Sequence, residues 1–162
     1  MKRQLSKKGF TLVELLLVMA LIGVLASALI VLINPVAQFQ RSRDSQRKND
    51  LAQVQRALEQ YYNDFNSYPA SSGVPNYYIL SNAWGTPWTP YMDVLPKDPA
   101  TTQTYRYIST GQTYMIYAHL ERGINDSQVC NGGAACSGVP PGAACPGVYV
   151  CNYGVSSSNA SP

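Results

Sequence analysis

The sequence predicts an α+β fold in which a long N-terminal helix, transmembrane and then amphipathic, packs on a small antiparallel β-sheet. Three observations support this fold class. An apolar run near the N-terminus is long enough to cross a bilayer. Apolar residues then recur every three or four positions as far as about residue 66. β-Rich segments and four cysteines follow, which predict a sheet and a disulfide-stapled C-terminal loop.

The apolar run contains a single charged residue. From Phe10 to Ile33 the chain has 24 residues, and only Glu14 is charged. A helix of that length reaches roughly 36 Å, which is enough to cross a bilayer. An ionisable group there costs on the order of 2–3 kcal/mol at mid-membrane and less near an end. A plain anchor does not need this cost, so we expect Glu14 to meet a partner in the membrane.

The helix should continue well beyond the membrane. Its second half carries an apolar stripe formed by residues at intervals of three and four: Leu51, Val54, Leu58, Tyr61 or Tyr62, and Phe65. The pattern stops before Pro69, because the residue before a proline is pushed out of helical geometry. We therefore expect one helix from about residue 10 to 66. Gly23 and Pro35 weaken it, and Pro35 predicts a kink or a segment able to unwind locally.

The C-terminal half predicts a small sheet. Residues 104–110 and 113–120 are strand candidates joined by a turn at Gly111-Gln112, and residues 147–155 can supply a third strand. Alternate residues of the second strand should face the helix stripe: Tyr114, Ile116, Ala118 and Leu120. The last residues, 156–162, are typical of a flexible tail.

Four cysteines predict disulfides in an oxidising compartment. Their spacing lacks a C-x-x-C pair and a nearby histidine pair, so a zinc site is not expected. Three connectivities are possible. We favour the nested pairing, Cys130–Cys151 with Cys136–Cys145, because both loops then close around the Pro140-Pro141-Gly142 turn.

The formal net charge of +3 does not indicate a partner of negative charge, because four of the twelve basic side chains lie in the first nine residues. Without that segment the chain has eight basic and nine acidic side chains, so nucleic acid is not indicated as a partner. The remaining bases cluster on the helix beside Asp44 and Asp50: Arg41, Arg43, Arg47, Lys48 and Arg56. We expect a solvated, mixed-charge helix face with an i,i+4 pair between Asp44 and Lys48. Contact with lipid headgroups is the alternative.

The first residues resemble the class III signal of the type IV pilin family: Lys7-Lys8-Gly9-Phe10-Thr11-Leu12-Val13-Glu14. The resemblance implies that a membrane peptidase recognises the basic leader, cuts after Gly9 and methylates Phe10. It also implies that Glu14 pairs with the N-terminal amine of a neighbouring subunit and that the helix can melt near Pro35. Two other readings stay open: an ordinary secretory signal cleaved at Ala26-Ser27-Ala28, and a plain single-span anchor.

The body is similar to the major pseudopilin of type II secretion and to related pilins. The similarity rests on segments in the same order: Tyr68-Pro69, Leu95-Pro-Lys-Asp-Pro99, Tyr105-Arg-Tyr107 and Tyr114 to Glu121. That pseudopilin commonly binds calcium in its C-terminal loop. Here Asn125 and Asp126 are present without a carboxylate cluster, so no calcium site or other cofactor is expected.

These features predict a structural subunit of a type IV pilus-like filament. The alternatives are a type II secretion pseudopilin and a membrane-tethered extracellular binding domain. An enzyme is not expected, because nucleophile and phosphate-loop motifs are absent and His119 fits an exposed strand position. The implied partners are related pilin subunits, the prepilin peptidase and methylase, the inner-membrane assembly platform and, before assembly, membrane lipid. We expect a single-pass inner-membrane protein with its C-terminal domain outside, which then enters an extracellular or periplasmic filament.

The expected organisation along the chain follows from these elements. It consists of a removed leader at 1–9, an assembly helix at 10–33, an amphipathic helix at 34–66, an αβ-loop at 67–103, a sheet with a cysteine-rich loop at 104–155 and a tail at 156–162.

Overall fold

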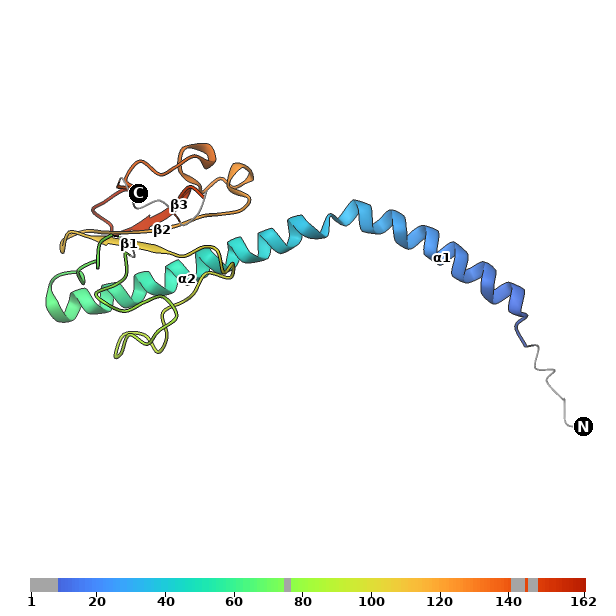
Figure 1. Cartoon of the computed structure of the whole chain (residues 1–162), viewed down its shortest axis with the longest axis horizontal. Coiled ribbons are helices and arrows are strands. Elements are labelled where there is room, and N and C mark those ends of the chain that lie inside the picture. Colours follow the sequence, from blue (N-terminus) through green and yellow to red (C-terminus); the bar gives the residue numbers. More distant parts are fainter. Residues whose placement is uncertain (1–8, 75–76, 141–144, 146–148) are drawn as a thin grey trace, which may run out of the picture. The chain divides into compact units, whose positions relative to one another are not determined.

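The computed structural model describes residues 9–74, 77–140, 145 and 149–162, without the side chains of 31–33. It contains two long helices, a three-stranded sheet and two short 3₁₀ segments (Figure 1). The elements are α1 (Leu12–Ile33), α2 (Pro35–Phe65), β1 (Arg106–Ser109), β2 (Tyr114–Ala118), η1 (Gly123–Asn125), η2 (Cys130–Gly133) and β3 (Tyr153–Ser156). The predicted α+β fold is confirmed. By contacts the chain divides into two units, Met1–Gln38 and Phe39–Pro162.

The helix predicted as one element is broken in two. Asn34 lies between α1 and α2 in the left-handed region, with φ 44° and ψ 76°. Asparagine tolerates this conformation because its short polar side chain bonds locally, and here Asn34 Oδ1 accepts the N–H of Ala37 at 3.3 Å. Pro35 then starts α2 at the first helical position, where its missing N–H costs nothing. The predicted kink is therefore a helix boundary, whereas Gly23 lies within continuous helix.

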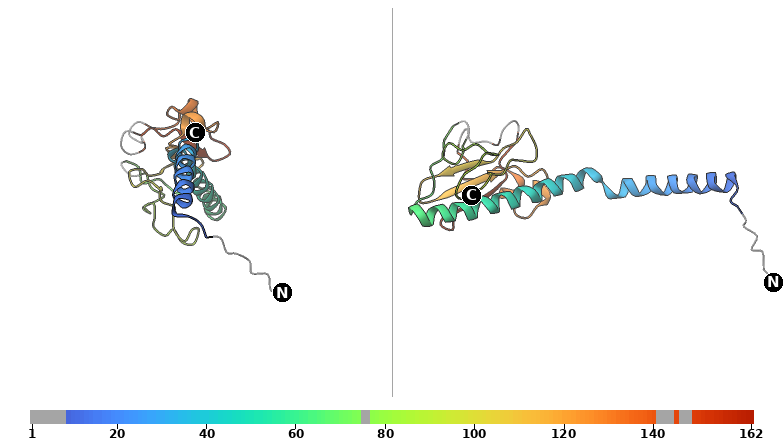
Figure 2. Two further views of the ribbon diagram at one scale, coloured as in Figure 1. Left: turned by 90° about the vertical axis from the view of Figure 1, so that its right-hand side faces the viewer. Right: turned by 90° about the horizontal axis from the view of Figure 1, so that it is seen from below.

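The main core lies between α2 and one face of the sheet. The sheet has the order β1-β2-β3 with both pairs antiparallel, and Tyr107 pairs with Ile116 and Ile116 with Val155. The right-hand view in Figure 2 shows the strands along one side of α2. Much of the predicted helix stripe meets the predicted β2 face in this core, where Leu51, Val54, Leu58, Tyr114, Ile116 and Ala118 are each at most 1% exposed. Tyr61 and Tyr62 pack against this core partly buried, and Leu120 is 1% exposed. The predicted end of the stripe is wrong, because Phe65 is 58% exposed.

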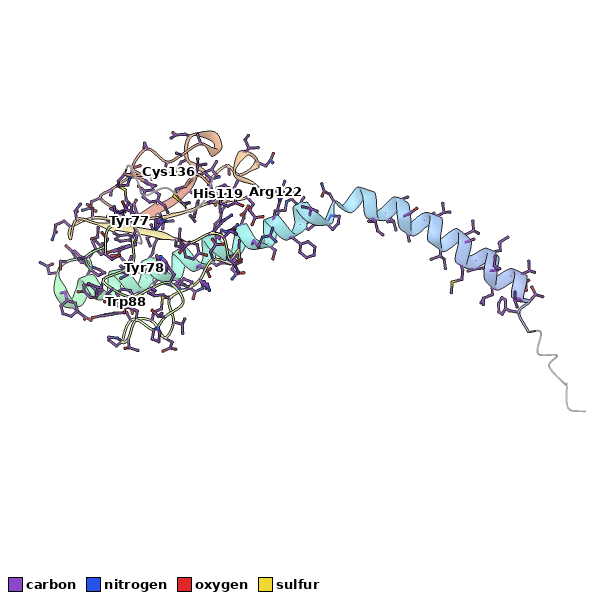
Figure 3. The ribbon with its side chains drawn as sticks, viewed as in Figure 1. Tyr77, Tyr78, Trp88, His119, Arg122 and Cys136 are labelled. Carbon is purple, nitrogen blue, oxygen red and sulfur yellow. A yellow bond between two sulfur atoms is a disulfide. The ribbon has the colours of Figure 1, made fainter. Side chains whose placement is uncertain are left out.

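The other face of the sheet is also covered. Tyr117 is fully buried there against Cys136, Cys145 and Cys151, so this cysteine-rich segment forms a second small core. Figure 3 shows Cys136 and Trp88 on opposite sides of the sheet. His119, expected at an exposed strand position, is half-buried and its ring contacts Tyr149 with centroids 4.9 Å apart.

The predicted nested disulfide pairing is wrong. The structure pairs Cys130 with Cys136 and Cys145 with Cys151, each across six positions, with Cα–Cα distances of 4.9 and 5.1 Å. Backbone hydrogen bonds already join the two loops, because Cys130 N–H donates to Asn152 O and Cys136 N–H to Cys151 O, both at 2.9 Å. Each bond therefore closes its own small loop.

The third strand lies later in the chain than the sequence predicted. It covers Tyr153–Ser156, and most of the expected segment precedes it. The expected flexible tail is also partly fixed, because Ser157 is 2% exposed and its N–H donates to Tyr114 O at 3.1 Å. The edge of β2 thus continues to pair with the chain beyond β3.

Candidate functional site

The N-terminus of α1 is a capping box built from Thr11 and Glu14. Thr11 is the N-cap, and its Oγ1 accepts the N–H of Glu14 at 3.2 Å. The Glu14 side chain reaches back, where Oε2 accepts the N–H and the hydroxyl of Thr11, both at 2.9 Å. This arrangement satisfies helix donors and places a carboxylate at the positive end of the helix dipole. Glu14 is thus hydrogen-bonded within one chain, rather than isolated as its place in an apolar run suggests.

The surface of α1 is apolar on every side. Leu12–Ile30 is the one helical segment of the described residues that is long and apolar enough to cross a membrane, with a mean hydropathy of 2.6. None of this segment is buried within the chain. Phe10, next to Gly9, is 89% exposed. Such a surface requires lipid or other helices around it.

The predicted processing and assembly residues lie at separate places on this unit. Gly9, Phe10 and Glu14 are close in sequence at the start of α1, while Pro35 lies at the break after it. The leader residues Lys7 and Lys8 lie outside the described residues.

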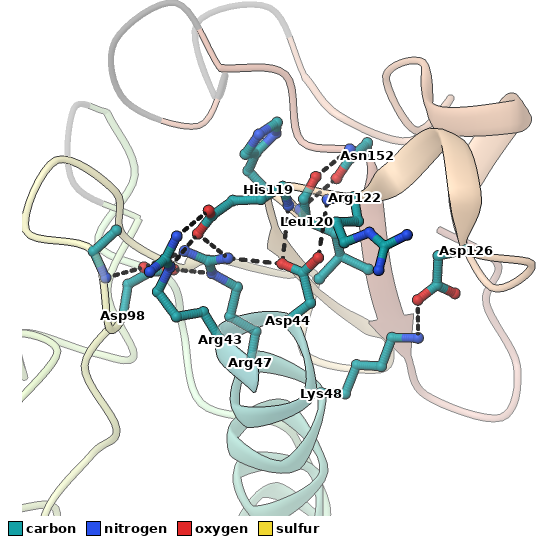
Figure 4. Close-up of polar contacts among 12 residues, drawn as sticks. Arg43, Asp44, Arg47, Lys48, Asp98, His119, Leu120, Arg122, Asp126 and Asn152 are labelled. Atoms are coloured by element: carbon teal, nitrogen blue, oxygen red, sulfur yellow. Dashed lines mark hydrogen bonds and ion pairs between the residues drawn. The ribbon is translucent and has the colours of Figure 1, made fainter. Parts of the chain in front are cut away.

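A buried ionic cluster connects α2 to the rest of its domain (Figure 4). We call it the Arg47 cluster, and its members are Arg43, Asp44, Arg47, Asp98 and Glu121. Arg47 is fully buried; its Nε and Nη2 donate to the two carboxylate oxygens of Asp98 at 2.9 and 3.0 Å. Its Nη1 donates to Asp44 at 2.8 Å and to Glu121 at 3.0 Å. One guanidinium therefore binds α2, the αβ-loop and the chain that follows β2 together.

Arg47 and Glu121 are both held in their charged forms. Burial disfavours the Arg47 cation, but the hydrogen bonds and charges of Asp98, Glu121 and Asp44 outweigh it and raise the pKa above the ordinary value. Hydrogen bonds from Arg43 in the first place, and from Arg47, lower the pKa of the Glu121 carboxyl. Arg43 binds Glu121 through two nitrogens, Nε at 2.7 Å and Nη2 at 2.5 Å, which is the fork geometry of strong carboxylate pairs.

Asp44 fixes the chain that follows β2. Its two carboxylate oxygens accept the backbone N–H groups of Glu121 and Arg122, both at 2.9 Å. The predicted pair between Asp44 and Lys48 is therefore wrong, because Asp44 turns inward. Lys48 pairs with Asp126 instead.

The expectation of a solvated, mixed-charge face on α2 is wrong for its central residues. Arg47, Asp44 and Asp50 are 0%, 4% and 8% exposed. Asp50 accepts the Tyr105 hydroxyl at 2.7 Å, and its burial raises the pKa of that carboxyl. The prediction holds for Arg41 and Arg56, which are exposed.

The sequence contained a signal for this cluster. The apolar stripe through Leu51, Val54 and Leu58 extends backwards at the same three- and four-residue spacing to Arg47 and Asp44. The charged residues thus occupy the buried face of α2, and a buried charge needs a partner. What sequence reasoning missed was the partner, Asp98, which lies 51 positions away.

Comparison with known proteins agrees with this architecture. The model of the prokaryotic N-terminal methylation motif matches residues 5–30. The model of type II secretion system (T2SS) protein G matches residues 34–135, well over half of the chain. The chain belongs to the T2SS protein G family. It is a pilin-like structural subunit and not an enzyme.

A curated relative supports the same family. The chain is 29% identical over 111 residues to the type II secretion system core protein G of Pectobacterium carotovorum subsp. carotovorum. The alignment covers 65% of this chain and 69% of that protein. No solved structure gives a significant match. Membership, together with α1, fits a protein anchored in the inner membrane and assembled with other pilin subunits.

Proposed function

We propose that this chain is a filament subunit that is cut after Gly9, methylated on Phe10 and polymerised through α1. The observation that carries the proposal is an all-apolar, unburied helix with one carboxylate at its start. After cleavage Phe10 carries a free α-amine, which has a pKa of about 8 and is largely cationic at neutral pH. A carboxylate and an ammonium that meet in lipid satisfy each other.

The capping box determines which oxygen of Glu14 can bind a neighbouring subunit. Thr11 occupies Glu14 Oε2, and no other described residue donates to Glu14 Oε1. A neighbouring ammonium therefore has a free oxygen to bind without breaking the helix start. The free energy gained when Glu14 pairs with this ammonium is smaller than for a carboxylate without hydrogen bonds, because the bonds from Thr11 already compensate part of the cost of desolvating Glu14.

We further propose that the filament is the pseudopilus of a type II secretion system. The family model and the curated relative both favour this assembly over a surface pilus. The prepilin peptidase and methylase, the assembly platform and inner-membrane lipid are the partners that this pathway requires. The N-terminus would lie in the cytoplasm and the domain beyond Pro35 outside, where the two disulfides can form.

A surface-exposed type IV pilus is the second candidate. The observation that favours it is the double-disulfide module over the outer face of the sheet. Such staples suit a subunit that faces the extracellular medium. Under either candidate the filament body is the same.

Deletion of the gene that encodes this protein distinguishes the two candidates, with protein export and surface filaments as the readouts. A pseudopilin deletion should stop export of secreted proteins and leave sheared surface filaments unchanged in electron micrographs. A pilin deletion should do the reverse. Mass spectrometry of the N-terminal peptide should give a methylated Phe10, and Gly9→Ser should leave the chain at full length. A mature N-terminus at Leu29 would instead establish an ordinary secretory signal and refute the proposal.

A further inference from the structure

A small basic pocket lies beside the Arg47 cluster, between α2 and η1. Its volume is about 290 Å³, and all its lining residues belong to the unit Phe39–Pro162. They comprise three cations, two carboxylates and two neutral polar residues: Arg41, Lys48, Arg122, Asp44, Asp126, Ser45 and Asn125. The proposed filament function assigns no role to this pocket.

The two carboxylates of the pocket are already engaged. Asp44 accepts hydrogen bonds from Arg47 and from the backbone N–H groups of Glu121 and Arg122. Asp126 pairs with Lys48 and accepts the N–H of Gln128 at 2.9 Å. Both acids are therefore compensated, and the capacity that remains in the pocket is that of hydrogen-bond donors.

Arg122 provides the donor without a partner. The half-buried Arg122 lines the pocket, and its Nη1 has no hydrogen-bond partner among the described residues. Because Nη1 is inaccessible to solvent, the guanidinium has to turn into the pocket for this nitrogen to meet an anion there. Figure 4 shows its guanidinium extending from Asp44 towards the Lys48–Asp126 pair. A buried charged donor left unsatisfied is costly, so native proteins pair such groups. The exposed Arg41 lines the same pocket and adds a second guanidinium.

We propose that this pocket binds a phosphate group. The two guanidinium groups match the oxygens of phosphate, which arginine binds through paired N–H donors, while the Lys48 ammonium beside them is already bonded to Asp126 and Gln128. The phosphate can come from the headgroup of an anionic phospholipid or from free phosphate. The lipid source is supported by sequence position, since Arg41 follows soon after the membrane-spanning segment that ends at Ile30 and after the exposed Phe39. Basic residues next to a span attract anionic headgroups.

The test uses the full mature chain in zwitterionic detergent micelles, with arginine side-chain nitrogens labelled for NMR. Three probes are titrated separately: inorganic phosphate, short-chain phosphatidylglycerol and short-chain phosphatidylcholine. We expect the Arg122 side-chain resonances to shift with a saturable dependence on phosphatidylglycerol. Phosphatidylcholine should bind more weakly, because its choline cation offsets the charge of the same phosphodiester and meets the cations of the pocket. Arg122→Gln should weaken binding about ten-fold or more, because charged hydrogen bonds are the strong ones.

Two further variants keep the test interpretable. Arg41→Gln changes an exposed residue of the pocket and should weaken binding about three-fold or more without altering the fold. Arg56→Gln removes an equally exposed charge of α2 that does not line the pocket, and should leave binding unchanged. Glu14→Ala should also leave binding unchanged, because the pocket lies within one chain; failure of the filament proposal would therefore not affect this result.

The possible outcomes distinguish a lipid headgroup from free phosphate, and they include results that would overturn the proposal. Saturable binding of inorganic phosphate with the same dependence on Arg122 and Arg41 supports a phosphate site that does not require lipid. Binding of phosphatidylglycerol alone supports a headgroup site. The proposal is overturned if neither probe binds, or if Arg56→Gln weakens binding as much as Arg41→Gln, since the attraction would then be a general charge effect.

Discussion

Arg47 and Asp98 form a bidentate ion pair in which both side chains are at most 1% exposed, although 51 positions separate them in the chain. Asp98 also accepts the N–H of Ala100 at 2.8 Å, so its carboxylate orders the end of the αβ-loop as well. The pair joins α2 to a long loop that has little regular structure of its own. The pair therefore helps to specify one position of the αβ-loop against α2. Its net contribution to stability is small compared with that of apolar packing.

Arg47→Ala should destabilise the domain severely. The change removes one cation and leaves the buried carboxylates of Asp98 and Asp44 without it, which costs about 3–5 kcal/mol for a buried pair. Denaturant unfolding of the full chain in detergent measures the loss, with the exposed Arg56→Ala as the control expected to stay within about 0.5 kcal/mol. Arg47→Lys should recover only part of it, since lysine cannot form the two-nitrogen fork. Equal stability of the Arg47 and Arg56 variants would contradict a structural role for the cluster.

The stability of the domain should fall in acid partly because of Glu121. Hydrogen bonds from Arg43, and then from Arg47, lower its pKa in the folded state below the ordinary 4.5. A depressed folded pKa gives stability that is complete above the unfolded pKa and is lost as pH falls through the folded value. Urea midpoints measured between about pH 3 and pH 6 should therefore rise with pH, and Glu121→Gln should flatten the lower part of that curve.

Asp50 has the opposite effect on how the stability of the domain changes with pH, so its variant serves as the control. Its burial raises its folded pKa, so protonation in acid favours the folded state. Asp50→Asn should thus steepen the loss of stability in acid, while Glu121→Gln reduces it. The same pH response in both variants would contradict this assignment.

Glu14→Ala should abolish filament incorporation and leave cleavage after Gly9 intact. The variant keeps the backbone bond from residue 14 to Thr11 Oγ1, so α1 still begins at its cap. It loses the carboxylate that the neighbouring ammonium is expected to meet. Pull-down of tagged subunits and electron microscopy measure incorporation, and intact mass measures cleavage. Ser27→Ala is the control; among the described residues this polar side chain donates a hydrogen bond only to Val24 O of its own helix. Normal filaments from Glu14→Ala would refute the assembly role.

Replacing Cys130 and Cys136 together by serine should leave the bond between Cys145 and Cys151 intact. Each disulfide closes a loop across six positions, and for so short a loop the chain-entropy model gives about 2 kcal/mol of stabilisation. Thiol titration of the unfolded variant should find no free cysteine, and denaturant unfolding should show the loss. Two free thiols would indicate the nested pairing instead.

Local sequence pattern was enough to predict several elements of this protein. The apolar run predicted α1, the three- and four-residue spacing predicted the buried face of α2, and alternation predicted the face of β2 that meets it. Pro35 also identified a weak point of the helix, although neither the role of Asn34 nor the separation into two elements was predicted, and Gly23 lies within continuous helix.

Which distant groups meet depends on how the whole domain folds. Asp44 and Lys48 have the spacing of a helix ion pair but do not pair with each other. Asp44 pairs with Arg47 of the same helix and accepts backbone N–H groups from the chain after β2, while Lys48 pairs with Asp126. The disulfide pairing was likewise not predicted by cysteine spacing; in the folded domain each cysteine pairs within its own loop, and backbone bonds join the two loops to each other. The physical reason is that a charge or a thiol selects its partner by proximity and burial in the folded domain, which sequence spacing does not encode.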